Sequence, residues 1–305
     1  MISRRAWLAA LVASLAAAAP AAQVFRGGTD TVFLSVTVTD PSQKLVTGLE
    51  EQEFRIFEDG VPQDITIFAR DRQPISLSIL IDTSTSMEPK LINAQDAATG
   101  FVSKLAASDV AQLIEFNSDT TIRQTFTGDQ AQLEQAVRKL RAGGSTSLYD
   151  ALYIALDELK RARATATPDA MRRQAIVLLS DGADTTSHVS YENVVEQSKK
   201  LDVIVYAIGL RDKEPQPRRV YNEAEFVLRT LSQQTGGRAF FVDDPMQLPG
   251  IYGQIADEIA NQYIVGYTSK NPKRDGAWRK VAVQVQRAGA TARTREGYYA
   301  PGAKR

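Results

Sequence analysis

Four short apolar runs, separated by longer amphipathic segments, constrain the fold of this chain more than any other feature. The runs span residues 75–81, 110–116, 175–180 and 203–209. Between them, apolar residues recur at the spacing of helices that bury one face. Buried strands that alternate with helices are typical of a parallel α/β sheet. We therefore predict an α/β domain over residues 74–262 with a doubly wound, mostly parallel sheet, in which residues 120–126 form an edge strand.

Segments with a β pattern flank this region on both sides. Residues 29–72 alternate apolar and polar side chains around Val36 and carry an Asp59-Gly60 turn signal. Residues 263–301 alternate again, for example around Val283. Neither flank is long enough to form a core of its own. We therefore expect the N- and C-terminal flanks to pack together as one small β-sandwich, with the α/β domain inserted between them.

The first residues have the pattern of an export signal. Arg4 and Arg5 precede an apolar stretch over residues 6–19, and Ala19-Pro20-Ala21 offers a small-x-small cleavage site. The stretch is too short for a comfortable membrane span. We predict that residues 1–22 are a signal peptide and that the mature protein is exported, to the periplasm or the medium, without a stable membrane span. An uncleaved anchor is the alternative.

Charge and residue content exclude several classes of function. The 305 residues include 36 basic and 36 acidic side chains. No basic stripe with interleaved aromatic residues appears, so we expect no nucleic-acid partner. The chain has no cysteine, which excludes disulfides, thiolate metal sites and cysteine nucleophiles. It has one histidine, which leaves little material for a hydrolytic triad.

Polar side chains follow two of the apolar runs at the point where each run ends. The motif Asp82-Thr83-Ser84-Thr85-Ser86 follows the first run, Asp181 follows the third, and Thr146 lies in a Gly-Gly-Ser-Thr segment before a predicted helix. In open α/β sheets, ligands bind at the carboxyl ends of strands. Hydroxyl and carboxylate oxygens suit a small hard cation. The candidate metal ligands are Asp82, Ser84, Ser86, Thr146 and Asp181.

Together these segments resemble the metal-ion-dependent adhesion site of von Willebrand factor type A domains. The first loop of that site is matched by Asp82, Ser84 and Ser86, the second by Thr146 and the third by Asp181. The flanks at residues 36–40, 54–60 and 297–301 look like those of von Willebrand factor A-related proteins common in acidobacteria. The likeness therefore covers nearly the whole chain beyond the leader.

The resemblance implies an adhesion-type module that binds a protein partner through a divalent cation. Ser84, Ser86 and Thr146 would offer hydroxyl oxygens to the metal. Asp82 and Asp181 would act directly or through water. A carboxylate of the partner would complete the shell. Mg²⁺ suits this set because it favours octahedral oxygen ligation and keeps waters, Mn²⁺ also fits, and Ca²⁺ fits less well.

Two other functions stay open, namely a metal-dependent hydrolase and a structural envelope protein with a vestigial metal site. Dehalogenase-type phosphatases also place an Asp after a first strand, but the second Asp they need is Ser84 here. The chain has no phosphate-binding loop and no nucleophile elbow, so we expect a binding module and no enzyme. We expect Asp150 to orient the second loop, Glu88 and Asp184 to set the potential at the rim, and His188 to lie on the surface.

Overall fold

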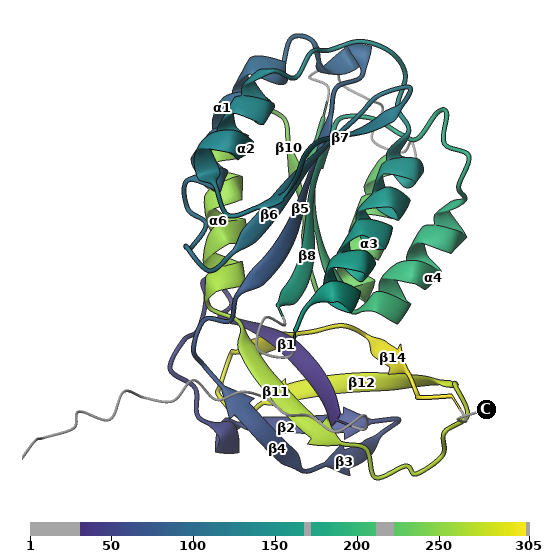
Figure 1. Ribbon diagram of the computed structural model, residues 1–305. Helices are drawn as coiled ribbons and strands as arrows, with labels where there is room; N and C mark the ends of the chain where they lie inside the picture. The colour runs from purple at the N-terminus through teal and green to yellow at the C-terminus, as the bar shows by residue number, and fades with distance from the viewer. Residues whose placement is uncertain (1–30, 168–171, 212–222, 303–305) are drawn as a thin grey trace, which may run out of the picture.

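The computed structural model describes residues 31–167, 172–211 and 223–302. The predicted signal peptide, residues 1–22, lies outside these ranges. A six-stranded sheet with helices on both faces stands on two four-stranded antiparallel sheets built from the chain's flanks (Figure 1). The predicted fold class, an α/β sheet with a small β-sandwich of both flanks, is therefore confirmed. No helix in the described ranges is long and apolar enough to cross a membrane.

The six-stranded sheet has the order β10-β9-β8-β5-β6-β7. Its strands are β5 (Ile75–Asp82), β6 (Val110–Phe116), β7 (Thr120–Thr127), β8 (Arg173–Ser180), β9 (Val203–Leu210) and β10 (Ala239–Val242). All neighbours pair in parallel except β6 and β7, which are antiparallel. The predicted runs correspond to β5, β6, β8 and β9, and the predicted edge strand is β7. The short outer strand β10 was not predicted.

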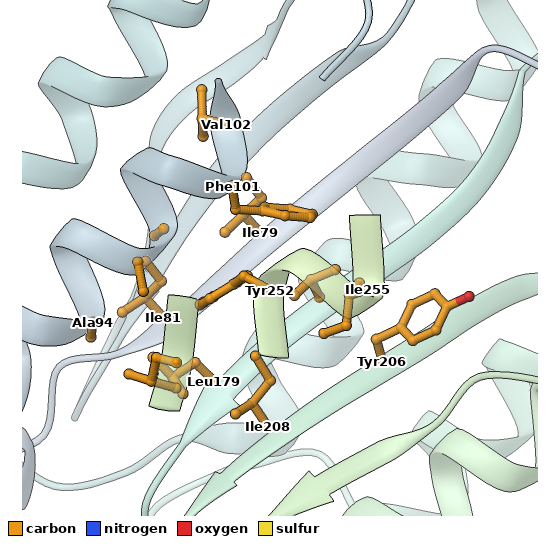
Figure 2. Packing of buried hydrophobic residues seen from close by; sticks show 14 of the residues in the cluster. Ile79, Ile81, Ala94, Phe101, Val102, Leu179, Tyr206, Ile208, Tyr252 and Ile255 are labelled. Atoms are coloured by element: carbon orange, nitrogen blue, oxygen red, sulfur yellow. The ribbon is translucent and has the colours of Figure 1, made fainter. Parts of the chain in front are cut away.

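Helices cover both faces of this sheet. The helices α1 (Leu91–Val102), α2 (Gln130–Arg138) and α6 (Leu248–Ala260) cover one face, and α3 (Leu148–Thr165), α4 (Tyr191–Leu201) and α5 (Glu223–Gln234) cover the other. Every residue of β5 is buried because both of its faces are covered. In Figure 2, Phe101 of α1 and Tyr252 of α6 lie beside Ile79 of β5, and the two aromatic ring centres are 5.1 Å apart.

The order of the strands reverses beside β5. The chain runs from β5 to its neighbour β6 on one side, and later places β8, β9 and β10 on the other. In such sheets, the crevice at the carboxyl ends of the strands, where the order reverses, is where ligands bind. The carboxyl ends of β5 and β8 border this crevice.

Each sheet of the sandwich combines strands from both flanks. One sheet has the order β13-β1-β11-β4 and the other β14-β12-β2-β3. The strands are β1 (Thr31–Thr39), β2 (Phe54–Glu58), β3 (Val61–Gln63), β4 (Ile65–Ala69), β11 (Tyr263–Thr268), β12 (Trp278–Val285), β13 (Thr291–Arg293) and β14 (Gly297–Tyr299). The Asp59-Gly60 pair turns β2 into β3, with both residues at positive φ as a tight hairpin requires.

The inserted α/β domain begins and ends on neighbouring strands of the sandwich. The chain enters it after β4 and leaves it from α6 into β11. These two strands pair antiparallel, with Val265 opposite Phe68. Entry and exit are therefore held side by side.

A buried carboxylate joins the two sheets of the sandwich. Glu58 is 2% exposed, and it accepts hydrogen bonds from the hydroxyls of Tyr267 at 2.9 Å and Tyr298 at 2.8 Å. Ser269 donates to it at 2.5 Å, and the Arg279 guanidinium at 3.2 Å. Burial alone would raise the pKa of Glu58, but these hydrogen bonds outweigh it and leave the pKa below its ordinary value.

Candidate metal site

The first predicted loop begins with a carboxylate that is fully buried. Asp82 is the last residue of β5 and is 0% exposed. One of its oxygens accepts the Ser84 backbone amide at 2.8 Å, and the other accepts the Ser180 hydroxyl at 2.6 Å. Because Ser180 ends β8, this carboxylate connects the ends of the two strands that border the crevice.

The hydroxyls of the first loop lead to the carboxylate of the third. Ser84 precedes a short 3₁₀ turn, η2 (Thr85–Met87). The Ser84 and Ser86 hydroxyl oxygens are 3.1 Å apart, and Ser86 donates to Asp181 at 2.8 Å. The Asp181 side chain is 1% exposed. Three of the five predicted ligands thus form one chain of oxygen atoms across two loops.

Thr146, from the second loop, lies against the third loop. It lies two residues before the start of α3, and its backbone carbonyl accepts the amides of Thr185 at 2.9 Å and Thr186 at 3.2 Å. A Cβ placed on Gly182 would lie 3.9 Å from the Thr146 hydroxyl. The hydroxyl therefore faces the glycine that directly follows Asp181.

A glycine fixes the first loop to the second. Gly144 has a φ of +84°, and a Cβ there would come within 2.7 Å of the Ser118 hydroxyl. Its carbonyl accepts both the backbone amide and the hydroxyl of Thr85, each at 3.0 Å. The amide of Gly143 donates to the Thr83 carbonyl at 2.7 Å. The backbone of the two loops is held in place by these contacts.

Two further acidic residues bind backbone groups around the third loop. Asp150 accepts the amides of His188 at 3.0 Å and Val189 at 2.9 Å. Asp184 accepts the Tyr149 amide at 3.2 Å. The His188 side chain is 92% exposed. These carboxylates therefore hold the third loop, and the exposed His188 ring places its Nδ1 3.1 Å from an Asp150 oxygen.

Lys90 is a site residue that the motif did not indicate. Its ammonium lies 2.6 Å from the second oxygen of Asp181, and its side chain is only 13% exposed. It is the N-cap of α1, where the helix dipole disfavours a cation. A lysine at the start of a helix, eight residues after Asp82, was therefore a signal that a carboxylate lay nearby.

The electrostatics and the donor atoms fit a small hard cation. Burial raises the pKa of Asp82; hydrogen bonds from Ser180 and Ser84 offset part of this, and nearby Asp181 adds to the rise. A bound cation would relieve the cost of this buried charge. In the described ranges no three His, Cys, Asp or Glu side chains gather as a metal cluster. Hydroxyls instead supply three of the five oxygen donors, which is compatible with Mg²⁺.

Comparisons with known proteins agree with this architecture. The sequence pattern of the von Willebrand factor type A domain matches residues 77–254, more than half of the chain. A UPF0353 protein from Mycobacterium bovis is 25% identical over 245 residues, covering 73% of this chain and 71% of that protein. A UPF0353 protein from Mycobacterium leprae is 24% identical over 250 residues, covering 76% and 72%.

One solved structure resembles nearly the whole described chain. A von Willebrand factor type A protein from Catenulispora acidiphila superposes with a TM-score of 0.52 at 13% identity, covering 90% of this chain and 74% of that one. At this identity the likeness is one of fold.

Proposed function

Because the chain belongs to the von Willebrand factor type A family, whose domains commonly mediate protein–protein interactions, we propose that it captures an acidic group of a protein partner through a divalent cation. The chain of oxygens from Ser84 through Ser86 to Asp181, beside the buried Asp82, is the observation that carries the proposal. The cation is Mg²⁺, and Mn²⁺ also suits these donors.

Each proposed ligand has a role that follows from its present contacts. Ser84, Ser86 and Thr146 offer neutral hydroxyl oxygens. Asp82, whose two oxygens already accept hydrogen bonds, holds the first loop, and both Asp82 and Asp181 act on the cation directly or through water. With few formal charges around it, the cation stays electrophilic, and a partner carboxylate can complete its coordination.

Thr146→Ala is expected to weaken partner binding far more than it weakens the fold. The change removes one metal oxygen without adding charge. By analogy with truncation of one member of a buried charge pair, the loss of binding is about 2–5 kcal/mol. Thr146 is 6% exposed, so the cost in stability is expected to be near that of a typical point substitution, about 1 kcal/mol, which is still below the loss of binding. The partner would be isolated from exported fractions with Mg²⁺, and its affinity measured with and without a chelator.

Thr66→Ala is the matched control, because it removes the same atoms from an exposed threonine in the sandwich. Chelator should mimic Thr146→Ala, and added Mg²⁺ should partly rescue it. An affinity that chelator leaves unchanged would show that the partner binds elsewhere. Metal-dependent hydrolysis of generic esters or phosphoesters would instead support a hydrolase.

Lys90→Gln is expected to tighten Mg²⁺ binding about tenfold. The Lys90 ammonium already neutralises Asp181 and repels a second cation, and a monovalent–divalent repulsion at roughly 6 Å in water is on the order of 1.4 kcal/mol. Calorimetric titration with Mg²⁺ measures the change. Lys104→Gln, at the other end of α1, is the control. Weaker binding by the Lys90 variant would mean that the ammonium positions Asp181 for the metal.

We also propose that the protein is exported and loses its leader. Mature protein should begin near Ala22 or Gln23, because Ala19-Pro20-Ala21 offers the cleavage site. Intact-mass analysis of cell fractions tests this. Full-length chain in the membrane fraction would identify an uncleaved anchor.

A further inference from the structure

A basic groove lies where the α/β domain meets the sandwich, at the end of the domain away from the candidate metal site. The C-terminal ends of α3 and α4 form one wall, and α4 contacts β14 below it (Figure 1). The cavity measures about 620 Å³ and is lined by seven lysines and arginines, against one acidic residue, Asp202. No element of the proposed metal-dependent function uses it.

Three of these seven cations are neutralised by carboxylates. The pairs are Arg279 with Glu58 at 3.2 Å, Arg295 with Asp202 at 2.8 Å, and Lys200 with Glu196 at 2.5 Å. Arg279 and Arg295 also donate to backbone carbonyls, so they belong to the framework of the groove. Lys199 and Lys273 carry the positive charge that these pairs leave over, and Arg163 and Arg274 line the groove beside them.

These four side chains reach the groove from three elements. Arg163, in the last turn of α3, donates to the Leu201 carbonyl at 3.3 Å. The Lys199 ammonium, from the last turn of α4, lies 5.2 Å from the ring centre of Trp278. Lys273 and Arg274 come from the loop between β11 and β12. Among the described residues, no carboxylate lies within ion-pair distance of Lys199 or Lys273.

Helix dipoles stabilise only some of these positively charged side chains. Cations in the last turns of α3 and α4 are stabilised by the negative end of each helix. Lys273 lies in a loop and gains nothing from a helix terminus. It still lines the same cavity as Lys199, and like charges gathered in one cavity repel one another. An anion with more than one negative charge would relieve this repulsion.

We propose that this groove binds an anion carrying clustered phosphate groups. Lysine and arginine are the side chains that proteins use for phosphate, because they offer charged donors without acceptors. The cavity volume is within the range of small-molecule sites. Phosphate groups of this kind are found in soluble pyrophosphate compounds and in the headgroups of anionic lipids. The proposal does not depend on the metal site.

Inorganic pyrophosphate is the first probe, titrated into the purified protein by calorimetry at low salt. The double variant Lys199→Gln/Lys273→Gln should bind it about tenfold more weakly or not at all, because the groove loses two positive charges that form no ion pair with a described carboxylate. The matched control is Lys104→Gln/Lys139→Gln, which removes two exposed charges, one just after α1 and one just after α2. Binding should also weaken as salt shortens the Debye length to about 8 Å at 0.15 M.

Tryptophan emission shows whether the probe enters the groove. Trp278 lies under Lys199, and the only other tryptophan of the chain, Trp7, is in the predicted leader. Pyrophosphate that draws Lys199 away from the ring should change the emission of the parent protein and leave that of the double variant unchanged.

Sedimentation with phosphatidylglycerol vesicles is the second arm. If the parent protein binds pyrophosphate and the double variant does not, the ligand is a soluble phosphate compound. If the parent binds vesicles but not pyrophosphate, and the double variant does not bind vesicles, the phosphate groups are those of lipid headgroups. The proposal is overturned if neither probe binds, or if the double variant binds like the parent while thermal unfolding shows it folded.

Discussion

Asp82→Ala is expected to abolish measurable Mg²⁺ binding while the α/β domain stays folded. Asp82 is fully buried at the end of β5 and holds both the Ser84 amide and the Ser180 hydroxyl. Removing it deletes one of the two carboxylates of the site and releases the loop that presents the serines. By analogy with buried charge pairs, the loss is about 2–5 kcal/mol of binding, which is hundredfold or more in its upper range.

The fold should tolerate this change because the lost carboxylate is itself costly. Burial raises its pKa, so the ionised form is disfavoured without a cation. Its hydrogen bonds contribute about 1.5–3 kcal/mol each as bonds to a charged group, and the relief of desolvation offsets part of their loss. Calorimetry with Mg²⁺, beside thermal unfolding, separates the two effects. Asp64→Ala, which removes an exposed carboxylate of the sandwich, is the control. Equal Mg²⁺ affinity in the Asp82 and Asp64 variants would refute the site assignment.

Glu58→Ala is expected to lower the free energy of unfolding by about 3–5 kcal/mol. It leaves the Arg279 guanidinium, whose side chain is 3% exposed, with only the half-exposed carboxylate of Asp275 at 3.7 Å, and a buried charge that loses its close partner is strongly destabilising. Two tyrosine hydroxyls also lose their acceptor. Denaturant unfolding measures the change, with Glu51→Ala, an exposed glutamate nearby, as the control. Equal losses in the two variants would show that the ion pair contributes no net stability.

Acid should reproduce this loss in the parent protein. The pKa of Glu58 is lowered in the fold, so its contribution is fully present above the unfolded-state value near 4.5. It is lost as pH falls through the folded value. The parent should therefore lose part of its stability below about pH 4.5, and Glu58→Gln should lose less over the same range. If the stability of the two proteins falls equally with pH, the acid-induced loss does not come from protonation of Glu58.

Local sequence patterns predicted the elements that are buried on both faces. Every residue of β5 is buried, and its mostly apolar sequence can therefore be distinguished from the amphipathic segments around it. The four residues of β10 alternate between buried and half-buried, and so short a segment has no clear period. That the two flanks pack together could be predicted from their small size. Which strands pair could not, because β4 and β11 join residues about 200 positions apart and no local pattern indicates such a pair.

The candidate ligands could be predicted together because they follow neighbouring strands. Asp82 ends β5 and Asp181 follows β8, and these strands pair in parallel, so their ends meet. The Lys90 contact was missed because it reaches a carboxylate 91 positions away. Glu58 carried an overlooked signal, since it has the same parity as Phe54 and Ile56 in β2 and therefore points inward with them.

The side-by-side entry and exit of the inserted domain decide how the protein responds to mechanical tension. The first and last described strands, β1 and β14, both lie in the sandwich. A pull between them places force on the sandwich. The paired strands β4 and β11 transmit this force directly from one to the other, so that it bypasses the α/β domain. The loops of the candidate metal site therefore bear no force until β4 and β11 separate, so their geometry is expected to persist while the chain is stretched.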